Sequence, residues 1–233
     1  MIHIVTETGS TNADMIALAR SGTAEGVWLR AERQRSGRGR QGRVWESPSG
    51  NFYGSTLVRL RPTDPPPATL ALVASVALTE TLRVFHPDGA LAIKWPNDVL
   101  LDGAKLSGIL LERTEDAVVI GIGVNLAHHP DLPGREAISL AARGIVVSPT
   151  VFADTLAERV ARWVADWRGE GMAIVRRRWL ELAHPIGTAL TVRLPDDSAT
   201  DGLFDGLDHD GALRLRLADG PVRVIHAADV FLI

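Results

Sequence analysis

The residues best suited to carry chemistry in this chain lie in one run between positions 37 and 45. Glycines alternate there with arginines and a tryptophan closes the run, in the order Gly37, Arg38, Gly39, Arg40, Gln41, Gly42, Arg43, Val44 and Trp45. Glycine allows the backbone to approach a ligand closely. Arginine carries a permanent charge, and its forked donors match carboxylate and phosphate oxygens. The run therefore predicts a mobile loop that folds over an anionic ligand.

Familiar nucleotide-binding loops do not account for this run. Its glycines satisfy the dinucleotide pattern G-x-G-x-x-G, but that pattern needs a helix directly afterwards, and residues 46–50 (Glu-Ser-Pro-Ser-Gly) cannot open one. With Val44 the run also fits the protein kinase glycine loop, yet no His-Arg-Asp or Asp-Phe-Gly element exists. No Gly-Lys-Ser/Thr completes a P-loop. An anion site of another kind is predicted, with a basic loop that touches nucleic acid as the competing interpretation.

A second group of reactive side chains lies at residues 94–98 (Lys-Trp-Pro-Asn-Asp), followed by Lys105. Asp102-Gly103 is a strong hairpin signal between them, so Asp98 and Lys105 are expected to face each other. As structure alone, the proline ends a strand and the charges form a surface ion pair that contributes little. Beside an arginine-rich loop, a converging carboxylate and ammonium favour a reaction site.

A third group is Gly121-Ile122-Gly123-Val124-Asn125, at the end of a predicted strand. Two glycines at alternate strand positions open one face of the sheet to close approach by a ligand. The amide of Asn125 could then recognise the edge of a heterocycle. Glycines in a strand more often mark a bulge, which is the plain alternative.

Alternating and helical patterns supply the elements that must position these groups. Strands are predicted at residues 2–6, 27–32, 51–60, 91–95, 99–101, 105–112 and 117–126. Helices are predicted at 13–20, with Ser10, Thr11 and Asn12 as capping residues, and at 68–85, 148–167 and 173–182. Residues 127–148 are predicted to be irregular. The arginine-rich loop thus lies between two strands.

The pattern changes near residue 184. Four short strands follow, at 188–194, 202–207, 212–217 and 222–227, separated by Asp, Gly and Pro turns. We expect an α+β fold in which a mixed β-sheet catalytic domain with flanking helices spans residues 1–184. A small antiparallel β-barrel is expected over residues 185–233.

Composition limits the class of protein. The 233 residues are 45% hydrophobic and include no cysteine, which excludes disulfides and thiolate metal sites. A net charge of −3 argues against a general nucleic-acid binder. No apolar run approaches the roughly 18 residues that span a bilayer, and the first residues lack a signal peptide pattern. A cytoplasmic protein with no membrane contact is expected.

Together these motifs resemble the biotin–protein ligase family. Its hallmarks are G-R-G-R-x-G-R-x-W, K-W-P-N-D, G-x-K-x-x-G-I-L and G-x-G-x-N, and all four are complete here and in order. The resemblance implies a scaffold like that of class II synthetases and lipoate ligases, followed by an SH3-like C-terminal barrel. It also implies a reaction in which biotin attacks Mg²⁺·ATP to give biotinyl-AMP. A lysine of a biotin carboxyl carrier protein or domain then takes the biotin. A lipoate or octanoate ligase or transferase on the same scaffold is the alternative.

The resemblance assigns roles residue by residue. The catalytic residues it implies are Lys105, Arg40 and Asp98. The biotin-binding residues are Ser10, Thr11, Asn12, Gln34, Gly37, Arg38, Gly39, Arg40, Lys105, Gly108, Gly121 and Ile122. The ATP-binding residues are Arg40, Arg43, Trp45, Asn97, Asn125 and Arg193. No metal-ligating residue is implied.

The chain departs from larger family members in two respects. Those members carry an N-terminal winged helix that binds operator DNA, whereas this chain begins at the first strand of the catalytic domain, so no DNA binding is expected. Near the other end, Ala227-Ala228-Asp229 stands where relatives usually have a glycine before the acidic residue. Whether the protein is a monomer or a homodimer is left open.

Overall fold

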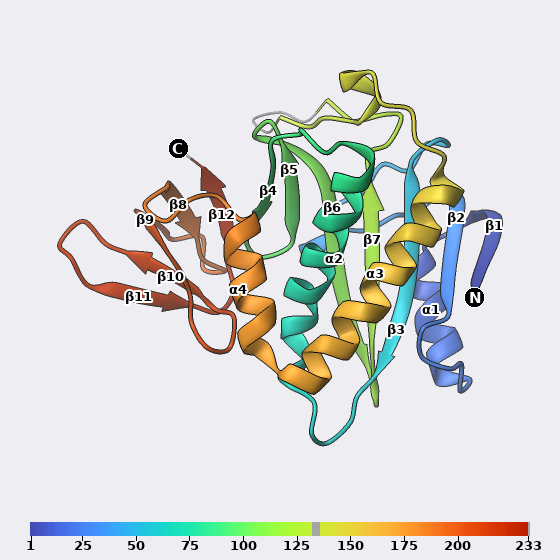
Figure 1. Cartoon of the computed structure of the whole chain (residues 1–233), viewed down its shortest axis with the longest axis horizontal. Coiled ribbons are helices and arrows are strands. Elements are labelled where there is room, and N and C mark those ends of the chain that lie inside the picture. The colour runs from blue at the N-terminus through green and yellow to red at the C-terminus, as the bar shows by residue number, and fades with distance from the viewer. Residues whose placement is uncertain (132–135, 233) are drawn as a thin grey trace.

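The structure is a computed structural model that describes residues 1–131 and 136–232 (Figure 1). Its larger sheet has seven strands in the order β1-β2-β3-β7-β6-β5-β4. Their bounds are β1 Ile2–Thr8, β2 Trp28–Gln34, β3 Phe52–Arg59, β4 Leu91–Lys94, β5 Asp98–Leu101, β6 Ala104–Thr114 and β7 Ala117–Val124. Only the β1–β2 pair is parallel. The expected mixed sheet is confirmed.

Helices cover the two faces of this sheet unequally. Helices α2 (Leu70–Phe85), α3 (Pro149–Glu170) and α4 (Met172–Leu182) pack on one face around the main hydrophobic core (Figure 1). The shorter α1 (Thr11–Arg20) packs on the other face over a small separate cluster that includes Met15, Leu57 and Val119. Because α1 covers only part of its face, the remainder is left for a ligand.

Strand β7 shows how the sequence produces this division. Its even-numbered residues from Val118 to Val124 point into the main core. Its odd-numbered residues point the opposite way, and Ala117 and Val119 pack under α1. The same face then continues with Gly121 and Gly123, which carry no side chain. The sheet is therefore bare where α1 ends.

Most predicted elements are present within a few residues of their predicted bounds. The 102–103 hairpin is confirmed, since Asp102 and Gly103 both adopt positive φ values of 52° and 82°. Ser10 caps α1 as predicted, with its side chain accepting from the Ala13 backbone N–H, although the helix begins at Thr11. The expectation that no apolar run is long enough to span a membrane is corrected. The helix Pro67–Phe85 passes that test of length and hydropathy, but 67% of its apolar window is buried inside the protein.

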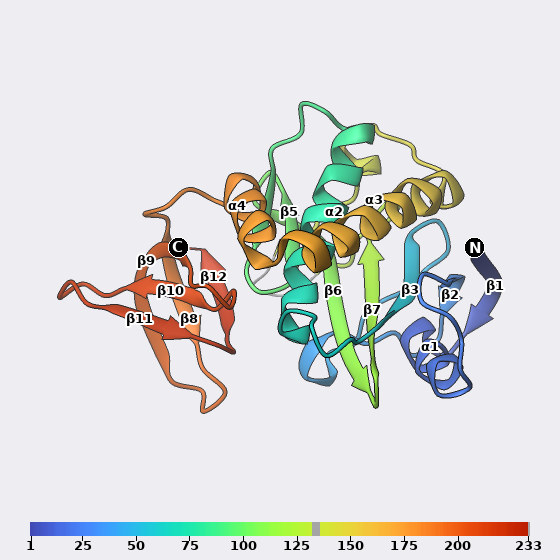
Figure 2. The same ribbon diagram turned by 60° about the horizontal axis from the view of Figure 1, so that its bottom comes forward.

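The C-terminal part forms a five-stranded antiparallel sheet beside the larger one (Figure 2). Its strands are β8 Ala189–Arg193, β9 Ala199–Leu207, β10 Leu213–Arg216, β11 Val222–Ile225 and β12 Asp229–Leu232, in the order β11-β10-β9-β8-β12. Strand β12 was not predicted, because it is short and begins with an aspartate. It pairs with β8 and brings Asp229 opposite Arg193.

The two sheets share one hydrophobic core. Phe204 and Leu213 of the small sheet belong to the same cluster as the helices of the large one. The Trp95 indole donates to the backbone carbonyl of Gly211 (3.1 Å). His184 lies between the two parts, with its ring 4.8 Å from that of Phe204. These contacts fix the small sheet in place beside the larger one.

Candidate active site

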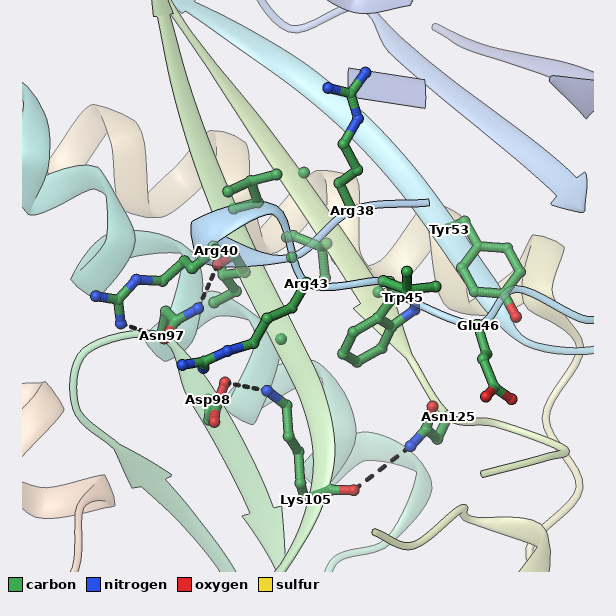
Figure 3. Close-up of a pocket in the computed structure, with 18 of the residues that line it drawn as sticks. Arg38, Arg40, Arg43, Trp45, Glu46, Tyr53, Asn97, Asp98, Lys105 and Asn125 are labelled. Carbon is green, nitrogen blue, oxygen red and sulfur yellow. Dashed lines mark hydrogen bonds and ion pairs between the residues drawn. The ribbon is translucent and has the colours of Figure 1, made fainter. Parts of the chain in front are cut away.

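A cavity of about 430 Å³ opens on the bare face of the large sheet (Figure 3). Segments far apart in the sequence contribute to it: the start of α1, the arginine-rich loop, the β4–β5 turn, β6, β7 and β12. Of the residues predicted from the sequence, those on its wall are Ser10, Thr11, Asn12, Gln34, Arg38, Gly39, Arg40, Arg43, Trp45, Asn97, Asp98, Lys105, Gly108, Gly121, Ile122 and Asn125. The structure thus brings nearly all of them together.

The arginine-rich loop is a hydrogen-bonded hairpin in this structure. The Trp45 N–H donates to the Gly37 carbonyl (2.9 Å) and the Gly39 N–H to the Arg43 carbonyl (2.7 Å). Gly37 is buried, and a Cβ there would lie 2.6 Å from the Trp45 carbonyl oxygen. Only glycine therefore fits at the base of the hairpin. Gly37 supports the wall from behind and is not on it.

The glycines of β6 and β7 form a seat for the Trp45 indole. A Cβ at Gly123 would lie 2.6 Å from Trp45 Cε2, and a Cβ at Gly108 would lie 3.1 Å from Cζ3. The Nζ of Lys105 lies 5.6 Å from the centroid of the indole. The indole N–H is buried, and among the described residues it has no hydrogen-bond partner. The close approach predicted for these strand glycines is thus made by a side chain of the protein itself.

Two arginines of the hairpin reach across to other segments. Arg40 donates to the Asn97 side-chain oxygen (3.2 Å) and to the Ala228 carbonyl (3.2 Å). Burial lowers the pKa of Arg40, an effect that the charges of Asp229 and Asp98 oppose. Arg43 forms an ion pair with Asp229 at the start of β12. The small sheet therefore holds the hairpin over the cavity.

Arg38 is placed differently from these two. Its side chain is exposed and extends away from Asp98 and Lys105 (Figure 3). Its backbone is bridged to that of Val44 across the hairpin. Arg38 therefore lines a different part of the cavity from Arg40 and Arg43.

The predicted pairing of Asp98 with Lys105 is confirmed. Asp98 Oδ1 lies 2.7 Å from Lys105 Nζ, and Asp98 Oδ2 lies 3.6 Å from Lys94 Nζ. Among the described residues Asp98 Oδ1 has no hydrogen-bond partner. Its contact with Lys105 is therefore an ion pair and not a hydrogen bond. Asp98 is only 7% exposed. A buried carboxylate thus lies between two ammonium groups on the cavity wall.

Polar side chains near the start of α1 form the opposite wall. The Gln34 side-chain oxygen accepts from the Thr11 backbone N–H (2.9 Å) and lies 3.1 Å from the Thr11 hydroxyl. The Gln34 amide nitrogen donates to the Ser47 hydroxyl (3.1 Å), which donates to the Trp45 carbonyl (3.0 Å). The wall is therefore linked directly to the hairpin.

Four other predicted residues have more specific positions. The amide nitrogens of Asn97 and Asn125 donate to the backbone carbonyls of Ile109 (2.7 Å) and Ile138 (3.1 Å). These amides therefore already brace the cavity wall. Arg193 is exposed on β8, with its guanidinium 5.4 Å from the Phe231 ring, and it is not among the residues that line the cavity. The Ile122 side chain packs in the main core, on the far face of β7.

The sequence analysis missed several residues that build the site. Tyr53 and Asp229 line the cavity, and Ser55 and Glu112 hydrogen-bond to residues on its wall. Alternation along β3 could have identified Tyr53 and Ser55, since their face is the face of Gly121 and Gly123.

The chain matches two protein-family models. The one described as the biotin/lipoate A/B protein ligase family matches residues 10–125, and the one described as the biotin protein ligase C-terminal domain matches residues 186–233. A Paracoccus denitrificans protein named biotin–[acetyl-CoA-carboxylase] ligase is 41% identical, covering 98% of this chain and 99% of its own length. A Mycobacterium tuberculosis protein of the same name is 34% identical, covering 98% of this chain and 88% of its own.

A solved structure shares the fold. The biotin protein ligase from Aquifex aeolicus, solved in complex with biotin and ATP, superposes with a TM-score of 0.88. The match covers 100% of this chain and 99% of that one, at 23% sequence identity. The arrangement of the two sheets is therefore that of a known architecture.

Proposed function

The chain belongs to the biotin protein ligases of the biotin/lipoate A/B protein ligase family, and from that premise we propose that it uses ATP to join biotin to a carrier lysine. The observation that carries the proposal is the convergence of Lys105, Arg40 and Arg43 on a cavity that also holds the buried carboxylate of Asp98. Biotin and ATP are both anions, and fixed cations are needed to bring them together.

In the first step, a biotin carboxylate oxygen bonds to the α-phosphorus of ATP as the bond to the leaving pyrophosphate breaks. Lys105 stabilises the charge that develops on the oxygens of biotin and the α-phosphate, while Arg40 and Arg43 hold the phosphates. Preorganised donors of this kind contribute several kcal/mol of barrier lowering. Within residues 1–131 and 136–232 no group of three or more His, Asp or Glu side chains could hold a metal ion. The proposed Mg²⁺ enters as part of the Mg²⁺·ATP substrate.

In the second step, a carrier lysine amine attacks the carbonyl carbon of biotinyl-AMP and AMP leaves. A free lysine amine is protonated at neutral pH, so its proton must be accepted. Asp98 is proposed to orient the incoming amine or to accept its proton, because its carboxylate lies on the cavity wall. The proposed carrier is the biotin carboxyl carrier domain of acetyl-CoA carboxylase or a related carboxylase, as the relatives' name indicates.

The remaining roles follow the two walls of the cavity. The proposed biotin-binding residues on the wall are Ser10, Thr11, Asn12, Gln34, Arg38, Gly39, Gly108, Gly121 and the backbone of Ile122, and Gly37 supports them from behind. Asn97 and Asn125 are proposed to face the adenine, with Trp45 covering the junction of the two ligands. Arg193 is proposed to contact ATP, although it lies outside the cavity lining in this structure.

We further propose a domain boundary between residues 184 and 185. The change from the seven-stranded to the five-stranded sheet and the two family matches support it. The protein is proposed to be a monomer or a homodimer. Sedimentation velocity distinguishes these two states.

The decisive experiment is exchange of labelled pyrophosphate into ATP. Exchange that depends on biotin is expected, because formation of biotinyl-AMP is reversible. Exchange with lipoate or octanoate but not with biotin would move the assignment to the alternative lipoyl or octanoyl chemistry. Absence of exchange with any acid would contradict the proposed ligase.

A further inference from the structure

The Asn12 amide is held in one orientation. Its nitrogen donates to Glu112 Oε2 (2.8 Å) and lies 3.4 Å from the Leu110 carbonyl oxygen. Its oxygen accepts from the Ser55 hydroxyl (2.6 Å). A flipped amide would direct its oxygen at a carboxylate and a carbonyl, which offer no proton. Glu112 therefore decides which end of the amide faces β6.

The surrounding packing leaves the amide no other place. Asn12 is 5% exposed and lies in the first turn of α1. A Cβ on Gly121 would overlap its side-chain oxygen. The glycine and the carboxylate thus act together: Gly121 provides the space and Glu112 provides the direction.

The orientation of Asn12 also sets that of Thr11. Ser55 has a single hydroxyl proton, and donating it to Asn12 leaves only lone pairs for the Thr11 hydroxyl 2.8 Å away. The Thr11 proton must then point to Ser55 or to the Gln34 oxygen at 3.1 Å. The Thr11 oxygen is consequently left as an acceptor on the cavity wall.

The wall therefore presents an acceptor to a ligand. That acceptor is the Thr11 oxygen, because both N–H groups of the Asn12 amide are directed at β6, toward Glu112 and the Leu110 carbonyl. An acceptor at this place matches the N–H of a cyclic urea such as the ureido ring of biotin. A dithiolane ring or an alkyl chain has no N–H to donate.

We propose that Glu112, which is not among the residues lining the cavity, is a positioning residue that sets the specificity of the site for a urea ring. It acts through Asn12 and, by way of Ser55, through Thr11. The inference rests on the proposed function, since it concerns how biotin is recognised.

The test is the KM for biotin in the pyrophosphate exchange assay. Glu112→Ala should raise it about tenfold, the usual effect of losing a hydrogen bond to a charged group. The KM for ATP and kcat should stay within about twofold of wild type. Glu112→Gln keeps an oxygen that can accept from Asn12, and should restore the KM for biotin to within about threefold of wild type. In a protein that already carries Asn12→Ala, adding Glu112→Ala should raise the KM for biotin by less than about a further twofold.

Ser55→Ala removes the hydroxyl on the other side of the same amide. It should likewise raise the KM for biotin and leave the KM for ATP unchanged. It keeps the test decisive if Glu112→Ala does not fold. Arg113→Gln, at the adjacent exposed position of β6, is the matched control. An unchanged KM for biotin, or equal rises for biotin and ATP, would overturn the inference while leaving the ligase assignment intact. A wild-type protein without biotin-dependent exchange would instead refute the proposed function.

Discussion

Adding one methyl group at Gly123 should disable the site without unfolding the protein. The new Cβ would lie 2.6 Å from Trp45 Cε2 and 2.7 Å from Nε1. Ordinary carbon contacts begin near ~3.5 Å, so the indole must retreat by about 1 Å. Strand β7 cannot yield instead, because β3 and β6 flank it and pair Gly123 with Tyr53 and Gly108.

The size of the effect follows from the cost of overpacking. An extra methyl in a well-packed place costs about 1–3 kcal/mol. If that cost falls on the closed hairpin, kcat/KM for biotin-dependent exchange should fall roughly 5- to 150-fold in Gly123→Ala. The half-exposed Trp45 can swing outward, so the melting temperature should change by no more than about 4 °C.

The assay needs a control and a coupled variant. Gly169→Ala adds a methyl in α3 where no atom lies within 4 Å, and should leave kcat/KM unchanged. Trp45→Phe should lower activity by itself, but should make a further Gly123→Ala change nearly silent, because the smaller ring leaves room. Two results would show that the strand glycines do not hold the Trp45 indole. One is wild-type kcat/KM in Gly123→Ala, and the other is a fully additive loss of kcat/KM in the Trp45→Phe, Gly123→Ala double variant.

Three other perturbations test separate parts of the structure. Lys105→Ala should lower the rate of adenylation by about 10²- to 10³-fold, measured as single-turnover formation of biotinyl-AMP; a wild-type rate would remove the central assignment. Burial, and the nearby charge of Lys94, lower the pKa of His184 from 6.5 to about 4. The unfolded chain therefore binds the proton first, and stability should fall as pH drops from 6.5 through 4, by on the order of 3 kcal/mol. In urea unfolding, the free energy of unfolding of His184→Phe should lack this fall between pH 6.5 and 4. The same pH dependence in the variant and the wild type would contradict the prediction. Arg168 donates to Glu25 (2.5 Å) and Asp64 (3.2 Å) and is nearly buried, so Arg168→Met should lower the free energy of unfolding by about 3 kcal/mol. Unchanged urea midpoints would argue against that network.

Local patterns predicted the parts of the site that local geometry fixes. Asp98 and Lys105 lie on two strands joined by one tight turn, so the turn residues were enough to place them near each other. They are not direct cross-strand partners, since Asp98 pairs with Gly108 and Lys105 with Leu100, and their side chains bridge the remaining distance. The strand glycines were predicted to admit the close approach of a ligand, and in the structure the Trp45 and Asn12 side chains approach them. What approaches them was not predictable, because Trp45 reaches β7 only through the long-range packing of the hairpin.

The parts that were missed depend on contacts between distant segments. Nothing near Asp229 in the sequence indicates an arginine partner, and its pairing with Arg43 requires the small sheet to dock against the large one. Glu112 lies on a strand whose pattern fits an ordinary solvated position. Its role is visible only once α1 brings Asn12 within hydrogen-bond distance.

The two ammonium groups around Asp98 have a practical consequence. Lys94 and Lys105 are the only lysines in the chain, and their side chains are just 16% and 23% exposed. Apart from the N-terminus, every primary amine of the protein therefore lies in one cavity. Reagents that modify amines will therefore react in that cavity or at the N-terminus. A bound acid or nucleotide should protect the two lysines from modification, and the intact mass of the protein measures that protection. The same arrangement leaves a reactive acyl-adenylate with no exposed lysine on its own enzyme to modify.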